Sequence, residues 1–273
     1  MGDDAGRRVP SFGIVTPTLN AGRYFDATLR SIWSQGQDLE IDHVVVDGGS
    51  TDATLDIARR YPSRILESKD DQGMYDAINK GMAVVKGDIV TYLNADDEIA
   101  SGALRLVRET FGSRPDIQWL CGTLQYTDSE GKVLGRMTPV KMSLRAFVGL
   151  GWCPIAQQTM WARREFFDRV GPFDIAFRNT GDYDWIARAM KLAPPTILRE
   201  TLGNWRIHGE MLSFDPEKMA RESRMVQDRN GGRDGTGGRS TLDWLYGKSL
   251  SLRLNLSNPR WLVAKKKGKI RFS

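Results

Sequence analysis

Short apolar runs alternate with helical patterns along the first hundred residues of the chain. The runs occupy 12–16 (FGIVT), 43–47 (HVVVD), 64–68 (RILES) and 88–93 (DIVTYL), and each predicts a strand. Strands separated by helices are typical of βα units, whose strands pair in parallel. The pattern therefore predicts an α/β fold with a mainly parallel central sheet flanked by helices.

Two of the segments between these runs carry apolar side chains at helical spacing. They are Phe25, Leu29, Ile32 and Trp33 in the first segment, and Ile78, Met82 and Val85 in the second. Each predicted helix would lie with one face against the sheet. The segment after the second run contains another helix start, where the hydroxyl of Ser50 or Thr51 is expected to cap the first turn.

The pattern changes after residue 100. Residues 101–111 predict a helix with its apolar side chains inward, and 117–135 predict two strands joined around 129–131. From 141 to 206 the pattern is helical but irregular, and aromatic residues are frequent. No internal repeat is present.

The C-terminal part of the chain differs in composition from the rest. The Gly-rich stretch 229–240 predicts a flexible linker between the main body and a tail. In the tail, leucines alternate at a period of two, which favours a strand over an amphipathic helix. These leucines are Leu250, Leu252, Leu254 and Leu256.

Composition limits the class of protein. The 273 residues are 40% hydrophobic, which suffices for one large α/β domain or two smaller ones. The net charge is +5, yet eight Lys and Arg residues and no acids lie between Lys248 and the C-terminus. The remainder is therefore net acidic and shows no basic stripe, which argues against nucleic-acid binding. The basic tail, with Trp244 and Trp261, favours contact with an anionic membrane surface.

The cysteines and the N-terminus indicate the compartment. Cys121 and Cys153 form neither a disulfide framework nor a CxxC pair for zinc or redox chemistry. The first residues, MGDDAGRRVPSF, lack the apolar core of a secretory signal, and no apolar run is long enough to span a bilayer. We therefore expect a cytoplasmic protein that is peripheral on the inner face of the membrane.

Polar side chains follow each of the four predicted strands, where ligands bind in an open parallel sheet. These side chains are Thr16, Pro17, Thr18 and Asn20; Asp47, Gly48, Ser50 and Asp52; Asp70, Asp71, Gln72 and Asp76; and Asn94, Asp96 and Asp97. Three of the four groups are acidic, and crowded carboxylates are costly without a cation. Oxygen donors of this kind suit Mn²⁺ or Mg²⁺, which commonly binds one or two carboxylates together with substrate phosphates.

Two common nucleotide-binding motifs are absent from the sequence. The stretch DGGSTD lacks the G-x-G-x-x-G pattern, and no G-x-x-x-x-G-K-[ST] loop occurs. Oxidoreductases with a dinucleotide-binding fold and P-loop NTPases therefore lose their main support.

The motifs together resemble those of the family 2 glycosyltransferases of the GT-A fold, especially bacterial enzymes of capsular polysaccharide, exopolysaccharide and O-antigen synthesis. The resemblance is carried by IVTPTLNAGRYFDATLRSIWSQ, HVVVDGGSTDATLDIARRY, ESKDDQGMYDAINKGMAVVKGDIVTYLNADD and GPFDIAFRNTGDYDWIARAM, in order over residues 11–210. It implies a Rossmann-like central sheet, a C-terminal acceptor-side region and a basic tail. The implied divisions are an N-terminal extension (1–10), a nucleotide-sugar-binding half (11–100), an acceptor-binding half (101–215), and a linker with the tail (216–273).

The resemblance also implies a nucleotide-diphosphate-sugar donor and a divalent metal, Mn²⁺ or Mg²⁺. The donor-binding residues that it implies are Thr16, Pro17, Thr18, Asn20, Asp47, Gly49, Ser50, Asp76, Asn79, Asn94, Ala95, Asp96 and Arg206. Among them Asp47 would bind the base, and Asp96 would meet the metal and the diphosphate. The chain departs from the commonest motif at Asn94, where many members have Asp, so the metal site has one charge fewer.

An inverting transfer needs a base beside the acceptor hydroxyl. The resemblance assigns this role to Asp182, although Gly181 replaces the Glu that usually precedes it; a helix cap is the alternative role for Asp182. His208 resembles a segment that closes these sites and would ligate the metal, with a structural role as its alternative.

The acceptor-side residues implied by the resemblance are Asp97, Gln157, Gln158 and Asp184. Trp152 and Trp161 are expected either to stack on sugar rings or to pack in the core. His43, inside the second run, is expected in the core.

These expectations describe a metal-assisted inverting glycosyltransferase that acts on a glycan or lipid-linked acceptor. Two alternatives remain at this point. A nucleotidyltransferase would also gather carboxylates around a metal, but TPTLNAGRY is a poor phosphate loop. A sugar-nucleotide-binding protein without transferase activity is kept open by Gly181 and Asn94.

Overall fold

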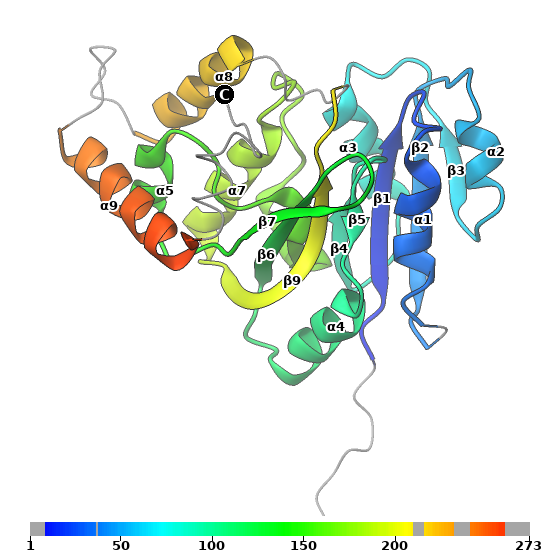
Figure 1. Ribbon diagram of the computed structural model, residues 1–273, viewed down its shortest axis with the longest axis horizontal. Helices are drawn as coiled ribbons and strands as arrows, with labels where there is room; N and C mark the ends of the chain where they lie inside the picture. Colours follow the sequence, from blue (N-terminus) through cyan, green and yellow to red (C-terminus); the bar gives the residue numbers. More distant parts are fainter. Residues whose placement is uncertain (1–8, 37, 210–215, 232–240, 260–273) are drawn as a thin grey trace, which may run out of the picture.

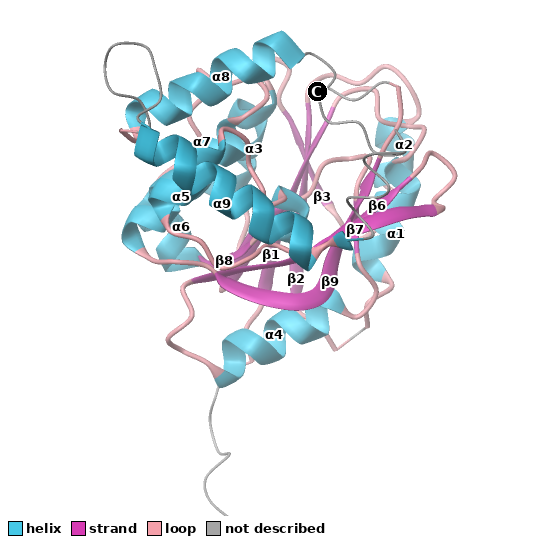
Figure 2. Ribbon diagram, turned by 60° about the vertical axis from the view of Figure 1, so that its left-hand side comes forward, coloured by secondary structure: helices cyan, strands magenta, loops and turns pink. Residues whose placement is uncertain are grey.

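The computed structural model describes residues 9–36, 38–209, 216–231 and 241–259. Within these ranges nine strands form one sheet in the order β3-β2-β1-β4-β8-β6-β9-β5, with β7 beside β6. The strands are β1 (Phe12–Thr18), β2 (Ile41–Asp47), β3 (Arg64–Glu67), β4 (Ile89–Tyr92), β5 (Glu98–Ile99), β6 (Trp119–Thr127), β7 (Val133–Met137), β8 (Trp161–Arg163) and β9 (Thr196–Arg206). Helices cover the sheet (Figures 1 and 2).

The helices follow the strands in chain order. They are α1 (Phe25–Trp33), α2 (Thr54–Ala58), α3 (Met74–Val84), α4 (Ala103–Ser113), α5 (Leu144–Leu150), the 3-10 helix η1 (Gln157–Thr159), α6 (Arg164–Val170), α7 (Gly181–Leu192), α8 (Pro216–Arg229) and α9 (Thr241–Ser257). The predicted α/β class is confirmed.

The four predicted N-terminal strands are confirmed, and they pair in parallel as β3-β2-β1-β4. Neighbouring residues of a strand face opposite sides of the sheet. In β1, Ile14 packs with α4 on one side and Val15 packs with α3 on the other. The predicted inward residues Ile78 and Met82 belong to the same apolar cluster as Val15. The register brings the carboxyl ends of β1, β2 and β4 to one edge of the sheet, which places the residues that follow them together.

The second half of the sheet is mixed. The predicted pair β6 and β7 is confirmed, but the helical interpretation of 141–206 is wrong for β8 and β9. Strand β9 pairs in parallel with β6 over most of its length, from Thr196 to Arg206. This pairing joins segments far apart in the sequence, so local periodicity does not report it.

The predicted helix cap after β2 is wrong. Helix α2 begins at Thr54, and the carboxylate of Asp52, not the hydroxyl of Ser50 or Thr51, accepts the backbone N–H of Thr54 at 3.0 Å. The Ser50 hydroxyl donates instead to Asp47, and the Thr51 hydroxyl donates to Asn20. These side chains therefore organise the loop that precedes the helix.

The segment expected to be linker and tail contains two helices. The strand predicted from the alternating leucines is wrong, since Leu250 to Leu256 lie in α9. Leu250 and Leu254 are one helical turn apart and bury against α5, while Leu252 and Leu256 are exposed. Alternating leucines contain this i, i+4 pair, which explains why period two misled the prediction. Residues 232–240 of the predicted linker and 260–273 of the tail lie outside the described residues.

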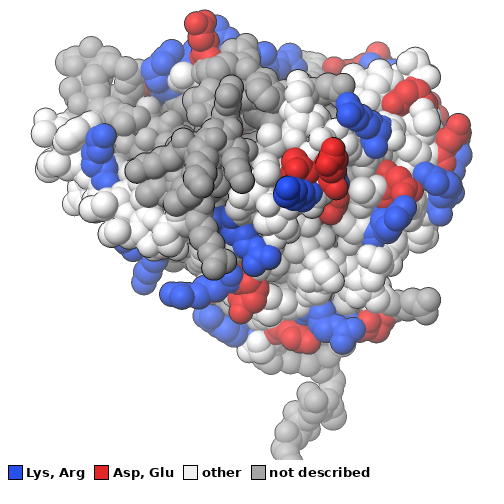
Figure 3. Space-filling model, viewed as in Figure 1, with Lys and Arg blue, Asp and Glu red and all other residues white. Residues whose placement is uncertain are grey.

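Two further expectations concern the absence of a basic stripe on the surface and the absence of a membrane-spanning segment. On the face drawn in Figure 3, basic and acidic side chains of the described residues are interspersed rather than gathered in a basic stripe. Among the described residues, no helix combines the length and the apolar character needed to cross a bilayer.

Candidate active site

A cavity of about 1110 Å³ opens at the edge of the sheet where β1, β2 and β4 end. Residues from both halves of the chain line it, together with the first turns of α3 and α7 and two side chains of α8. The predicted site residues that line it are Pro17, Thr18, Asn20, Asn94, Ala95, Asp96, Asp97, Gln157, Gln158, Asp182 and His208. The structure thus brings together the predicted base, the predicted metal residues and part of the predicted donor set.

Some of the predicted nucleotide-binding residues support the cavity from outside it. Thr16 is buried, and its hydroxyl lies 2.9 Å from Nε2 of His43. His43 is itself buried, as expected, and burial lowers its pKa to about 3. The carboxylate of Asp47 accepts backbone N–H groups from Gly49 and Ser50 at 3.0 and 2.9 Å. In this arrangement Asp47 holds its own loop, and its role in binding the base stays a prediction.

Asp76 and Asn79, on α3, also lie outside the cavity lining. The carboxylate of Asp76 accepts the N–H of Gln72 and pairs with Lys80, which keeps the turn before α3 in place. The amide of Asn79 exchanges two hydrogen bonds with the backbone of Phe173, at 2.8 and 2.9 Å. Asn79 thereby fixes the loop before α7 to α3, so both side chains act on the scaffold in this structure.

Asp96 and His208 face each other across the cavity wall. Nε2 of His208 lies 2.9 Å from Oδ2 of Asp96, and the imidazole ring packs on Tyr24 with centroids 4.7 Å apart. The nearby Asn94 contributes an amide whose Oδ1 is buried and has no partner among the described residues. A carboxylate and an imidazole therefore meet after β4, and Asn94, which lines the same cavity, carries an unused amide oxygen.

This donor set bears on the divalent metal that the fold family implies. Among the described residues, no group of three or more His, Cys, Asp and Glu side chains could hold a metal ion. The residues present fit a Mg²⁺ or Mn²⁺ ion that takes one carboxylate, one imidazole and an amide oxygen from the protein and its other ligands from substrate phosphates and water. Asp96, His208 and the unpaired Oδ1 of Asn94 provide those three groups.

Asp97 lies beneath Asp96 and is 1% exposed. Its carboxyl group accepts hydrogen bonds from Gln158 at 2.8 Å, from the backbone of Arg206 at 3.2 Å and from Asn94 at 3.4 Å. Burial, with the neighbouring charge of Asp96, raises the pKa of Asp97 well above its usual value. Asp97 and Gln158, both predicted on the acceptor side, thus tie the end of β4 to η1 and β9.

Arg206 is buried and lies behind the cavity wall. Its guanidinium pairs with Glu98, and its Nε donates to the backbone oxygen of Asp96 at 3.3 Å. The guanidinium also lies 5.0 Å above the ring of Tyr24. Arg206 therefore supports Asp96 and Tyr24, and direct contact between Arg206 and the donor stays a prediction.

Asp182 is the second residue of α7 and lines the cavity. Its Oδ1 accepts the N–H of Tyr183 at 2.8 Å and the hydroxyl of Tyr75 at 3.4 Å. Burial is the main cause that raises the pKa of Asp182 to about 6. A carboxylate with this pKa is largely ionised near neutral pH and still basic enough to accept a proton, as a general base requires.

Glu222 of α8 holds the loop that leads into α7. Its carboxylate is 4% exposed and accepts three consecutive backbone N–H groups, those of Arg178, Asn179 and Thr180, at 2.9–3.1 Å. Charge-assisted hydrogen bonds of this kind fix a loop firmly. Since Asp182 follows two residues later, α8 restrains the predicted base.

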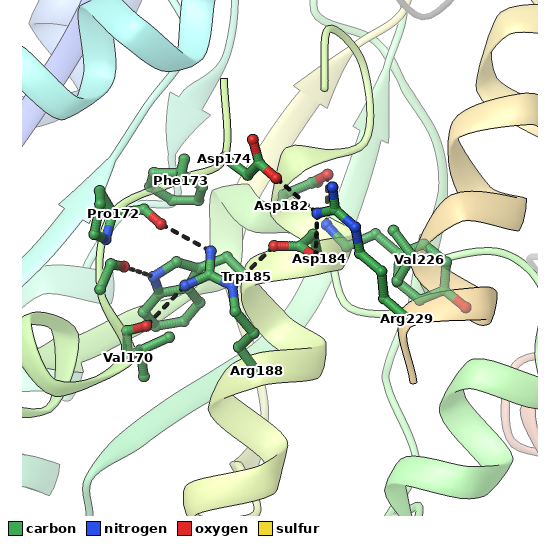
Figure 4. Close-up of polar contacts among 12 residues, drawn as sticks. Val170, Pro172, Phe173, Asp174, Asp182, Asp184, Trp185, Arg188, Val226 and Arg229 are labelled. Atoms are coloured by element: carbon green, nitrogen blue, oxygen red, sulfur yellow. Dashed lines mark hydrogen bonds and ion pairs between the residues drawn. The ribbon is translucent and has the colours of Figure 1, made fainter. Parts of the chain in front are cut away.

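Asp184 lies on the other side of α7, away from the cavity. It pairs with Arg188 at 2.8 Å and with Arg229 of α8 at 3.6 Å, as Figure 4 shows. Residues two apart on a helix point in different directions, so the base position and Asp184 cannot share one face. The structure therefore places Asp184 in the α7–α8 interface rather than among the acceptor-side residues.

The acceptor side of the cavity combines one polar group with an apolar wall. Gln157 is 4% exposed, and both of its amide atoms lack partners among the described residues. Trp152 lines the cavity and packs on the apolar cluster of Leu124, Tyr126 and Met137. Trp161 is buried in the core instead, against Phe12.

The sequence interpretation missed several residues of this site. Tyr24, Tyr75 and Glu222 were not predicted. Tyr24 contacts His208 and Tyr75 contacts Asp182, while Glu222 binds the loop just before Asp182. One signal was present for Tyr75, because Gly181 leaves space beside Asp182 that a large side chain must fill. Nothing in the local sequence marks Glu222, since its three partners lie more than 40 positions away.

Comparison with known proteins gives one family and several relatives. Residues 13–171 match the family described as Glycosyl transferase family 2. A PGL/p-HBAD biosynthesis glycosyltransferase of Mycobacterium tuberculosis is 31% identical over 186 residues, which cover 66% of this chain and 69% of the relative. An uncharacterized glycosyltransferase of Nostoc is 26% identical over 209 residues, 72% of this chain and 64% of the relative.

Solved structures show the same fold. TarS of S. aureus aligns with 84% of this chain and 44% of its own, with a TM-score of 0.59 and 16% identity. The 1–349 fragment of TarS in complex with UDP-GlcNAc aligns with 93% of this chain and 79% of its own, with a TM-score of 0.59 and 19% identity. Asp182, Arg206, His208 and Glu222 lie beyond the residues that the family match covers.

Proposed function

The chain belongs to glycosyltransferase family 2, and on that premise we propose that it moves a sugar from a nucleotide-diphosphate-sugar donor to a hydroxyl of a glycan or lipid-linked acceptor, with inversion at the anomeric carbon. The observation that carries the proposal is that Asp96, His208 and Asp182 line one cavity. Membership of the family removes the support for a nucleotidyltransferase.

The donor would lie along the end of β1 and β4. Pro17, Thr18 and Asn20 line this part of the cavity and would border the nucleoside. The binding of UDP-GlcNAc by the TarS fragment supports a nucleotide sugar as the donor class. The first turn of α3 lies on the same side, where Gly73 and Met74 line the cavity.

Asp96 and His208 would hold the metal together with the diphosphate of the donor. A divalent cation at this place offsets the negative charge that develops on the diphosphate as it leaves. The unpaired Oδ1 of Asn94 adds an acceptor without a charge. With two or three protein ligands, the metal site is completed by the donor, so metal and nucleotide sugar would bind together.

Asp182 would act as the general base. Oδ1 of Asp182 is engaged by Tyr183 and Tyr75, which leaves Oδ2 to accept the proton of the acceptor hydroxyl. As that proton moves to Oδ2, the acceptor oxygen forms a bond to the anomeric carbon from the face opposite the diphosphate. The bond from the anomeric carbon to the diphosphate oxygen breaks, and its electron pair leaves with the nucleoside diphosphate. The protonated Asp182 then returns its proton to water.

The acceptor would occupy the part of the cavity between Asp182 and the apolar wall. Gln157 carries an unused donor and an unused acceptor there, which suit hydroxyl or amide groups of a substrate. Trp152 offers an aromatic face beside it. A sugar presents both kinds of surface, polar hydroxyl groups at its edge and C–H groups on its face.

A donor panel tests this proposal. The full chain is incubated with UDP-, GDP-, CDP- and dTDP-sugars, with Mn²⁺, with Mg²⁺ or with chelator, and release of the nucleoside diphosphate is measured. We expect release from one class of donor that depends on the metal and is lost in Asp96→Ala. Equal release with chelator from the wild-type chain would contradict the metal part of the proposal.

We also propose that the protein is cytoplasmic and peripheral on an anionic membrane surface. The exposed apolar residues of α9, among them Leu245, Leu252 and Leu256, support this location. Trp244 and Tyr246 lie beside Lys248 and Arg145, a combination of aromatic rings and cations that suits the lipid headgroup region. In Figure 3 the left edge of the molecule, where α9 lies in Figure 1, is mostly uncharged.

A further inference from the structure

Gly181 is a glycine because of the space around it. A Cβ atom built on Gly181 would lie 2.7–2.9 Å from three ring atoms of Tyr75, closer than real side chains approach. The backbone of Gly181 starts α7 and does not have a positive φ, so backbone conformation does not require glycine there. The ring of Tyr75 therefore occupies the place that a side chain at position 181 would fill.

Tyr75 is held firmly in this place. It is the second residue of α3 and is 2% exposed. Its ring stacks on Phe173 with centroids 5.5 Å apart and an interplanar angle of 25°. Asn79, one turn further along α3, fixes the backbone of the same Phe173. The hydroxyl of Tyr75 thus has a defined position at the end of a packed ring.

This hydroxyl makes two contacts with Asp182. It accepts the backbone N–H of Asp182 at 3.3 Å and donates to Oδ1 at 3.4 Å. The N–H belongs to the first turn of α7, where backbone donors have no partner within the helix. Tyr75 therefore fixes both the start of the helix and the direction of the carboxylate.

We propose that Tyr75 is a positioning residue for the catalytic base, and that Gly181 is present so that the tyrosine can reach it. The inference rests on the proposed role of Asp182. With Oδ1 fixed by Tyr75 and by the N–H of Tyr183, rotation of the carboxylate is restricted. Oδ2 is then the oxygen directed at the acceptor hydroxyl. At position 181, glycine stands where the family usually has Glu, and the ring of Tyr75 takes the space of that side chain. The catalytic base, Asp182, is retained.

The titratable groups that face Asp182 determine how its pKa changes when the hydroxyl of Tyr75 is removed. They are Tyr75 on α3, Tyr92 on β4, Cys153 in the loop before η1, and Glu222 on α8. The hydroxyl of Tyr75 stabilises the ionised carboxylate and lowers its pKa, while the charge of Glu222 raises it. Loss of the hydroxyl therefore moves the pKa of Asp182 further upward.

Carbon-13 NMR of the Asp carboxyl groups in the full chain tests the inference without a substrate. The signal of Asp182 is assigned by its loss in Asp182→Asn, and its titration is followed in Tyr75→Phe and Gly181→Ala. We expect the midpoint, about 6 in the wild type, to move upward in both variants. Tyr61→Phe, which removes a tyrosine hydroxyl from Asp26, and Gly112→Ala, where a Cβ would meet only Pro10 at an ordinary contact distance of 4.0 Å, are matched controls that should leave it unchanged.

Kinetics give the second measurement. In Tyr75→Phe we expect kcat to fall roughly tenfold, KM for the donor to stay constant, and the acidic limb of the pH profile to follow the NMR midpoint. An unchanged midpoint and an unchanged pH profile in both variants would overturn the inference. If Asp182→Asn keeps full transfer activity, the assignment of the base fails instead, whatever the NMR shows for Tyr75.

Discussion

Nε2 of His208 lies 2.9 Å from Oδ2 of Asp96, although 112 positions separate the two residues in the chain. The contact joins the loop after β4 to the segment that follows β9. It closes the donor side of the cavity and places an imidazole beside the carboxylate that the sequence motif singles out. The proposed metal site depends on this pair.

Removal of the imidazole should weaken the metal-dependent part of donor binding. Mn²⁺ should increase the affinity of the wild type for the nucleotide sugar. In His208→Ala we expect this increase to be smaller by a factor of roughly ten to a hundred, because the metal loses one of its few protein ligands. Calorimetry with and without Mn²⁺ measures the difference. His43→Ala is no control here because His43 is buried, whereas exposed Lys69→Ala changes the cavity rim without changing the metal ligands. An equal effect of Mn²⁺ on both variants would contradict the assignment.

Asn94→Asp should make the stability of the protein depend on the metal. The substitution places a third carboxylate beside Asp96 and Asp97, and like charges at this distance repel. We expect the free energy of unfolding without metal to fall by about 1–2 kcal/mol, and Mn²⁺ to restore it. Denaturant unfolding in chelator and in Mn²⁺ measures both values. If Mn²⁺ stabilises the variant no more than the wild type, Asn94 does not border the metal.

Asp182→Asn should remove activity and raise stability. The folded chain raises the pKa of Asp182 from 3.8 to about 6, so the folded state holds the proton more tightly than the unfolded state. This carboxyl group therefore lowers the free energy of unfolding progressively as the pH rises from about 4 to 6, and the loss is complete above that range. We expect Asp182→Asn to be more stable than the wild type at pH 7 by about 1–3 kcal/mol. The difference should vanish near pH 4, and a constant difference across this range would show that the pKa is not raised.

Activity should follow the same group with the opposite dependence on pH. The base must be ionised to accept a proton, so kcat/KM should rise with pH through about 6 and then level off. Initial rates between pH 4.5 and 8, at fixed metal and donor concentrations, measure this profile. A rate that is independent of pH in this interval would show that no group with such a pKa takes part.

Glu222→Gln should loosen the loop before α7. The carboxylate accepts three backbone N–H groups in a buried place, and an amide at the same position would turn donors toward some of them. We expect a loss of about 1–3 kcal/mol in the free energy of unfolding, together with a lower kcat. Glu217→Gln, on the exposed side of the same helix, is the matched control. Equal stability and activity of the two variants would show that α8 does not restrain Asp182.

Membrane association should depend on the outer side of α9. Leu252→Lys and Leu256→Lys replace exposed leucines of this helix, and both should reduce sedimentation with anionic liposomes. Leu192→Lys replaces an exposed leucine outside α9 and should have no effect. The proposal would be abandoned if truncation after Arg239 left sedimentation unchanged.

The spacing of apolar residues predicted those strands and helices whose formation depends on nearby sequence. The four N-terminal strands and the helices α1, α3 and α4 follow apolar periodicity, and the structure confirms them. Strand β9 was missed because its partner β6 lies far away in the sequence. The helix α9 was mistaken for a strand because its leucines satisfy both periods.

The candidate site shows the same division. The ordered motifs identified Asp96, His208 and Asp182, which the structure brings to one cavity. The positions of individual side chains could not be predicted from the motifs, because they depend on the three-dimensional fold. Asp184 points away because of the helical turn, and Asp47 accepts hydrogen bonds from its own loop. Tyr75 and Glu222 act on Asp182 from other elements, and no spacing in the sequence connects them with it.

The proposed function depends above all on Asp182, which we infer takes the acceptor proton in an inverting transfer from a nucleotide sugar. Proton NMR of the product formed by the wild type and by Asp182→Asn, with the same donor, metal and acceptor, examines this step. We expect a product with the anomeric configuration opposite to that of the donor, formed at a rate that falls by at least a hundredfold in the variant. A product with retained configuration, or equal rates for the two proteins, would contradict it.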